Sequence, residues 1–221
     1  MDNNKPHRFL PLDLPLFEDK QAVLDTFDGN MEESYWHKEE LTERDRSIPF
    51  GAIPAPFTQE ALRKYPTLIE YITTHWPIKE YVYLALMRAN RDVQPHVDGN
   101  FLDDKGPVNR YNTITPEYYE HQWITEPCGY RMLLKGSRSN LYLCDTYDPT
   151  YKKKDWEGLN KQYCVIPEDT DCFALQTNDS PHGADYTEDD DDRLLLFAVG
   201  WIDVVRHHAL IEKSERRYGR F

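Results

Sequence analysis

The chain of 221 residues has few cysteines, few positive charges and no long hydrophobic run. Its four cysteines form no CxxC pair, which argues against a zinc knuckle and a dense disulfide framework. The formal net charge of −13 argues against a broad surface that binds nucleic-acid phosphates. No stretch approaches the roughly 18 apolar residues of a membrane-spanning helix, and the first residues lack a basic-then-apolar signal pattern. We therefore expect a cytoplasmic protein that neither enters a membrane nor binds nucleic acid.

Enough apolar residues are present for one hydrophobic core, with 39% hydrophobic and 13% aromatic residues. The chain shows no internal repeat and no Gly/Ser linker, so a single domain is expected. We divide it into an N-terminal extended and helical support (1–78), a core (79–205) and a C-terminal basic tail (206–221). The tail is expected as a terminal helix or a mobile arm.

Helical spacing is confined to the first third of the chain. Residues 21–27 fit either a short strand or a short helix. Thr58 is a candidate N-cap, and Pro66 interrupts the amphipathic pattern that follows it, so two short helices or one kinked helix are expected. The apolar positions of this pattern are Ala61, Leu62, Tyr65, Leu68, Ile69, Tyr71 and Ile72.

Beyond Pro77 the pattern changes to short runs of aliphatic, aromatic and β-branched residues separated by turn formers. Helices followed by many closely spaced strands predict a mainly β fold, a sandwich or barrel with helices on one outer face. The predicted strands are residues 80–88, 130–134, 140–144, 162–166, 172–176 and 193–202.

A metal site is suggested by two separate segments. His96 and Asp98 lie two residues apart at a predicted strand end, so both side chains point to one side, although a surface pair would look the same. His182 follows the strand 172–176 and a polar turn. Arg193 opens the most apolar run of the chain and needs an anionic partner, either a ligand or the acidic run 188–192. Two histidines, one carboxylate and open positions are the ligand set of non-haem Fe(II) oxygenases.

In this order, His96, Asp98, His182 and Arg193 resemble the iron and co-substrate residues of the 2-oxoglutarate-dependent dioxygenases. The run from Arg193 to Asp203 resembles most the aspartyl/asparaginyl β-hydroxylase branch. The resemblance spans about residues 80–205 and implies a double-stranded β-helix (jelly-roll, cupin-like) core with flanking helices.

The resemblance also implies an enzyme that uses Fe(II), 2-oxoglutarate and dioxygen. His96, Asp98 and His182 would be the metal ligands and catalytic centre, and Arg193 would pair with the far carboxylate of 2-oxoglutarate. Arg131, one cation in an apolar strand, would help to bind the co-substrate or the substrate; a salt-bridged structural arginine is the alternative. The acidic run is expected as a solvated loop, and residues 99–125 as a lid or substrate-recognition element.

Some members of that branch lack the carboxylate ligand, whereas Asp98 is present here. The expected activity is hydroxylation of a free amino acid, a small metabolite or a protein side chain. A cupin-like module that binds metal or ligand without turnover is one alternative, and a structural interaction protein another. A nucleic-acid-modifying oxygenase is disfavoured by the charge and by the apolar residues after Arg193. His121, His207 and His208 are expected at the surface or behind the metal ligands.

Overall fold

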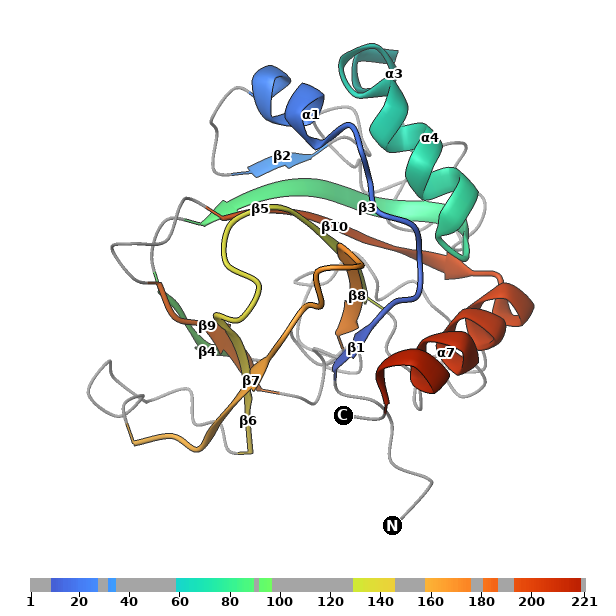
Figure 1. Cartoon of the computed structure of the whole chain (residues 1–221). Coiled ribbons are helices and arrows are strands. Elements are labelled where there is room, and N and C mark those ends of the chain that lie inside the picture. Colours follow the sequence, from blue (N-terminus) through green and yellow to red (C-terminus); the bar gives the residue numbers. More distant parts are fainter. Residues whose placement is uncertain are drawn as a thin grey trace, which may run out of the picture.

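The computed structural model describes eight segments of the chain: residues 9–27, 32–34, 59–89, 92–96, 129–145, 158–175, 181–186 and 193–219. They form two antiparallel β-sheets and four helices (Figure 1). Asp98, the loop 99–125, Thr58, His121 and the acidic run 188–192 lie outside these segments. No helix among the described residues has the length and apolar character needed to cross a membrane.

The larger sheet, sheet A, has six strands in the order β1-β8-β5-β10-β3-β2. All of its pairs are antiparallel, and β10 forms the longest of them, with β3. Its strands are β1 (Phe9–Pro11), β2 (Glu32–Ser34), β3 (Ile78–Ala89), β5 (Gly129–Lys135), β8 (Cys172–Leu175) and β10 (Arg193–Ile202). The N-terminal segment, expected only to support the core, therefore adds two strands to sheet A.

The smaller sheet, sheet B, has the order β4-β9-β6-β7. Its strands are β4 (Val93–His96), β6 (Leu141–Cys144), β7 (Lys161–Cys164) and β9 (His182–Ala184). From β3 to β10 the chain passes between the sheets: β3, β5, β8 and β10 belong to sheet A, and the strands between them belong to sheet B. Two antiparallel sheets connected in this way are compatible with a β-sandwich of jelly-roll type.

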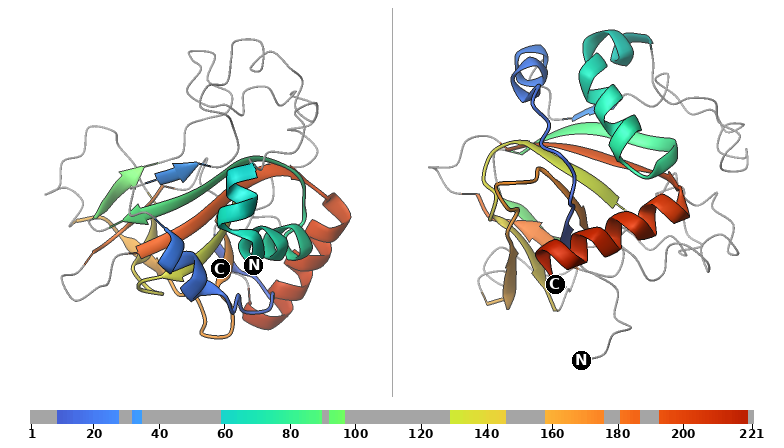
Figure 2. Two further views of the ribbon diagram at one scale, coloured as in Figure 1. Left: turned by 90° about the horizontal axis from the view of Figure 1, so that it is seen from above. Right: turned by 45° about the vertical axis from the view of Figure 1, so that its right-hand side comes forward.

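Helices cover the outer face of sheet A (Figures 1 and 2). They are α1 (Lys20–Thr26), α3 (Gln59–Lys64), α4 (Pro66–His75) and α7 (Val204–Tyr218). Their apolar side chains form one buried cluster with alternate residues of sheet A, which we call the helix-side core. Its members with at most 2% exposure include Leu10, Leu12, Leu68, Ile72, Trp76, Tyr130, Met132, Leu86 and Leu196.

A second buried cluster, which we call the inner core, lies between the two sheets. It contains Phe9, Leu133, Leu143, Cys164, Ile166, Phe173 and Leu175, with Leu141 and Leu195 packed against it. Side chains alternate along a strand, so Met132 and Leu134 of β5 enter the helix-side core while Leu133 enters the inner core. A residue two positions before Leu133 on β5 therefore points to the same side as Leu133, into the space between the sheets.

Most predicted strands lie where they were expected, and the structure decides the open helical assignments. Residues 21–26 belong to a helix, α1, which Phe27 ends as its C-cap, and Pro66 begins a second helix, α4, instead of kinking one long helix. Proline is tolerated there because the first helical residue has no intrahelical use for its N–H. The tail is mostly helix α7, which Asp203 caps by accepting a hydrogen bond from the backbone N–H of Arg206.

Candidate metal and co-substrate site

The two predicted histidine ligands lie directly opposite each other on neighbouring strands. His96 ends β4 and His182 begins β9, and the two are Cα partners in the antiparallel pair. Their ring centroids are 4.3 Å apart. His182 was expected after the strand 172–176 and a polar turn; it opens a short strand of its own, β9, which is not among the predicted strands. Pairing with β4, and not the preceding strand, fixes its position.

An irregularity in β4 turns His96 toward its partner. Val93 pairs with Ala184, and His96 pairs with His182, so β4 advances by three residues while β9 advances by two. In a regular pair Pro95 would lie opposite His182, and His96 would point to the other face of the sheet. The extra residue of this bulge brings the His96 side chain to the face that carries His182. β4 lies at the edge of sheet B, where a strand tolerates Pro95 and a bulge.

The same irregularity orients the His96 ring. Its Nδ1 lies 2.8 Å from the backbone carbonyl oxygen of Gln94, a residue within the bulge. A carbonyl oxygen only accepts hydrogen bonds, so Nδ1 carries the proton, and in the neutral ring Nε2 keeps its lone pair. A hydrogen bond from one ring nitrogen to a carbonyl is the usual arrangement of a metal-binding histidine.

Both rings face the space between the sheets. His182 pairs with Leu143 of β6, and cross-strand partners project to the same face. Leu143 belongs to the inner core, and only 6% of His182 is exposed. The imidazole pair therefore sits at the edge of the apolar inner core.

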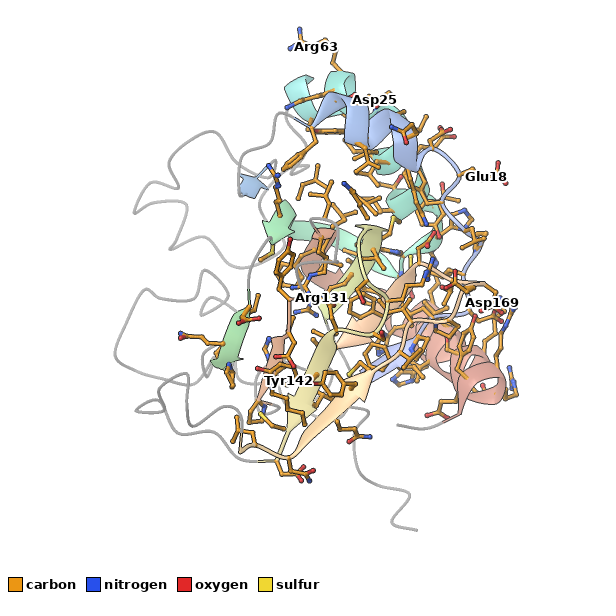
Figure 3. The ribbon with its side chains drawn as sticks, turned by 60° about the vertical axis from the view of Figure 1, so that its left-hand side comes forward. Glu18, Asp25, Arg63, Arg131, Tyr142 and Asp169 are labelled. Atoms are coloured by element: carbon orange, nitrogen blue, oxygen red, sulfur yellow. The ribbon has the colours of Figure 1, made fainter. Side chains whose placement is uncertain are left out.

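The two predicted arginines face the same space from sheet A. Arg131 lies two residues before Leu133 on β5, and Arg193 lies two residues before Leu195 on β10. Each is only 8% exposed. The guanidinium of Arg131 stacks 4.5 Å over the Phe197 ring and donates to the carbonyl oxygen of Leu175. Figure 3 labels Arg131 among the side chains of the ribbon.

Arg193 reaches from sheet A to sheet B. Its Nη1 donates a 3.1 Å hydrogen bond to Oδ1 of Asn140, the residue before β6. The backbone oxygen of Asn140 in turn accepts from the N–H of Asp185, just beyond β9. From His182 to Asp185 the chain advances by about 10 Å at the usual rise of a strand. The Arg193 guanidinium is therefore offset from the imidazole pair by about the length of β9.

Gly136 allows the turn after β5 to lie against Arg193. Its φ is +106°, and a Cβ at this position would lie 2.8 Å from the Arg193 Cα. Both the backbone conformation and the space exclude a larger residue without rearrangement. The sequence indicated a turn here; the contact with Arg193 follows only from the pairing of β5 with β10.

Among the described residues, no three His, Cys, Asp or Glu side chains gather as a metal-binding group. The predicted carboxylate ligand, Asp98, lies outside them, so the part that can be assessed is the imidazole pair. Two facing histidines, one with a carbonyl-held ring, fit a divalent transition metal.

His207 does not lie where the sequence suggested. It is completely buried on the helix side of sheet A, where its Nδ1 is hydrogen-bonded to the hydroxyl of Tyr130. Tyr130 belongs to the helix-side core, so sheet A separates His207 from the imidazole pair. His208, the next residue of α7, is exposed, as expected. The two histidines differ in burial because neighbouring residues of a helix point in different directions. The sequence alone did not show which side of α7 packs against sheet A.

No family model and no curated protein matches this sequence. Solved structures with weak similarity to this chain include AviO1 from Streptomyces viridochromogenes Tue57, at 10% identity and a TM-score of 0.40 over 89% of this chain and 90% of that one. The non-haem α-ketoglutarate-dependent epimerase SnoN from nogalamycin biosynthesis has 11% identity and a TM-score of 0.40, over 89% and 78%. IDO from Bacillus thuringiensis has 10% identity and a TM-score of 0.30, over 83% of each chain. Similarity this low assigns this chain neither family nor activity.

Proposed function

We propose that this protein is an Fe(II)- and 2-oxoglutarate-dependent hydroxylase built on a double-stranded β-helix. The observation that carries the proposal is the opposed pair His96 and His182, held on the inner face of sheet B. The passage of successive strands between the two sheets supports the β-helix. Its substrate would be a free amino acid, a small metabolite or a protein side chain.

The iron would be held by His96 and His182, with Asp98, two residues beyond His96, as the third ligand. Nε2 of His96 is suited to this role because the Gln94 carbonyl holds the proton on Nδ1. Two imidazoles and one carboxylate on one side of an iron ion leave its remaining positions open to co-substrate and dioxygen. The bound iron and 2-oxoglutarate would supply an oxidant that inserts one oxygen atom of dioxygen into a C–H bond, with release of succinate and carbon dioxide.

Arg193 would bind the carboxylate of 2-oxoglutarate that lies away from the metal. A five-carbon dicarboxylate that chelates a metal at one end needs its second partner several ångströms away, and Arg193 is offset from the imidazoles along β9. The bond to Asn140 fixes one arm of the guanidinium, which prepares the rest of the planar fork for a carboxylate. The residues of the inner core keep water from the space between the sheets.

Arg131 is a second cation on the inner face. It lies opposite Phe197 on β10, four residues beyond Arg193, or about 13 Å along the strand. The two arginines therefore serve different parts of the site. We assign Arg193 to the co-substrate because it is the one that bridges to sheet B, and Arg131 to the co-substrate's surroundings or to an acidic group of the substrate.

Anaerobic titration of the metal-free protein with Fe(II) and 2-oxoglutarate tests this proposal. The wild-type protein should develop the visible charge-transfer band of the chelate, His96→Ala should lose it, and His208→Ala, a change at an exposed histidine, should keep it. A band would be followed by a substrate screen for succinate release. Absence of a band from the folded wild-type protein would overturn the proposal. Metal binding without succinate release from any substrate would favour a cupin-like binding module. Binding of single-stranded DNA at low salt would favour a nucleic-acid substrate.

A further inference from the structure

The bulge in β4 places His96 opposite His182. A side chain from β6, the strand on the other side of β9, contacts this bulge. Tyr142 of β6 pairs with Gly183 of β9, and its hydroxyl donates a 3.5 Å hydrogen bond to the carbonyl oxygen of Val93, the residue where the bulge begins. The tyrosine thus crosses the whole width of β9 to reach β4. Figure 3 shows Tyr142 on its strand.

Gly183 makes this crossing possible. A Cβ at position 183 would lie 2.6 Å from Cζ of Tyr142 and 2.6 Å from the Val93 carbonyl oxygen. These distances are shorter than real Cβ contacts, so any side chain there would displace the tyrosine, the bulge or both. A glycine inside a strand, directly after a histidine, is the trace that this close approach leaves in the sequence.

Tyr142 lies on the opposite face of sheet B from the imidazole pair, since its neighbours Leu141 and Leu143 pack in the inner core. It is 1% exposed, and Lys161 Nζ lies 4.4 Å from its ring centroid. Burial, with a smaller effect of the Asp185 carboxylate, raises the pKa of the Tyr142 hydroxyl far above its ordinary value. The hydroxyl therefore remains a hydrogen-bond donor throughout the range in which an enzyme works.

We infer that Tyr142 is a positioning residue: by holding the Val93 carbonyl across Gly183 it fixes the β4 bulge, and through it the separation and facing of His96 and His182. It lies on the opposite face of sheet B from both histidine rings, and it acts through the backbone of β4. This inference rests on the proposed metal site. It predicts that removal of the Tyr142 hydroxyl weakens metal binding although Tyr142 is not itself a proposed ligand.

Titration of the metal-free protein with Co(II), followed by visible absorption at a temperature where all variants are folded, tests the inference. Tyr142→Phe removes the hydrogen bond and keeps the ring, and we expect it to weaken Co(II) binding about three- to tenfold and to alter the absorption bands. Gly183→Ala should weaken it more. Tyr163→Phe is the matched control, since it removes an exposed hydroxyl on β7 that is bonded to Asp185, the residue after β9, and it should bind like the wild type.

The outcomes separate the two hypotheses. Loss of thermal stability in Tyr142→Phe with unchanged Co(II) affinity and spectrum would show that the tyrosine is only structural, and would overturn the inference while leaving the metal site intact. Failure of the wild-type protein to bind Co(II), or binding that persists unchanged in His96→Ala, would overturn the proposed metal site itself.

Discussion

Arg193 and Asn140 join the two sheets through a 3.1 Å hydrogen bond between Nη1 and Oδ1. Arg193 is the first residue of β10 in sheet A, and Asn140 immediately precedes β6 in sheet B. The bond holds a buried guanidinium across the space between the sheets, beyond the end of β9. The candidate co-substrate site therefore depends on a residue, Asn140, that the sequence did not single out.

Arg193→Ala should raise the 2-oxoglutarate concentration needed for half-maximal turnover by orders of magnitude, because the far carboxylate loses its cation. Asn140→Ala should raise it less, since the guanidinium remains but one arm is no longer fixed. Steady-state kinetics with varied 2-oxoglutarate measures both, and Co(II) titration should give wild-type affinity for each. An unchanged 2-oxoglutarate requirement in Arg193→Ala would transfer the co-substrate role to Arg131.

His182→Ala should abolish iron-dependent turnover while the fold persists. The side chain sits at the start of the short strand β9, and its removal takes away one of the two described residues that we propose as ligands. Circular dichroism and thermal unfolding check the fold, and succinate release checks turnover. His208→Ala on the exposed face of α7 is the control. A His182→Ala protein with full activity would show that the ligand assignment is wrong.

Gly136→Ala should destabilise the protein by about 1–3 kcal/mol, because the turn has φ +106° and a Cβ would lie 2.8 Å from the Arg193 Cα. Gly219→Ala is a matched comparison: its φ is +84°, but nothing lies within 4 Å of the added Cβ. Gly219→Ala therefore has only the conformational cost of the positive φ, and it should lose less unfolding free energy than Gly136→Ala. Urea unfolding gives both free energies. Equal losses in the two variants would mean that the contact with Arg193 adds nothing.

The Cys172 thiol should resist alkylation until the protein unfolds. Burial raises its pKa from 9.0 to about 12, and only the thiolate reacts. Mass spectrometry of peptides after iodoacetamide treatment near pH 8, with and without guanidinium, measures this. Modification of Cys172 in the folded protein at the unfolded rate would contradict the burial.

The same thiol makes stability depend on pH in the alkaline range. The folded pKa of Cys172 is raised, so its contribution is fully present below about pH 9 and is lost as pH rises from about 9 toward 12, where only the unfolded thiol has ionised. Near pH 10.5 the loss should be on the order of 2 kcal/mol. Urea unfolding near pH 8 and pH 10.5 gives the loss of unfolding free energy for the wild type and for Cys172→Ala. The part of the loss that comes from the Cys172 thiol should be missing from the variant. An equal alkaline loss in both would rule it out.

The strands could be predicted from the sequence because each needed only a local pattern. The runs 130–134, 172–176 and 193–202 are apolar enough to be buried, and the described residues of each lie in an observed strand. The order His96, His182 and Arg193 likewise nominated residues that the structure places on facing inner surfaces. Shorter strands escaped prediction. β1, β2 and β9 have three residues each, too few to show a period, and only pairing with longer strands makes them extended.

The sequence by itself determined which residues are chemically capable of forming a site and which segments are apolar enough to bury. Tertiary structure alone decided that His96 meets His182. A one-residue shift in β4 sends the ring to one face or the other, and that shift depends on contacts with Tyr142 and Gly183, which lie far along the chain. It also decided that His207 is buried behind sheet A, because the docking of α7 is set by the whole helix-side core and by no local pattern.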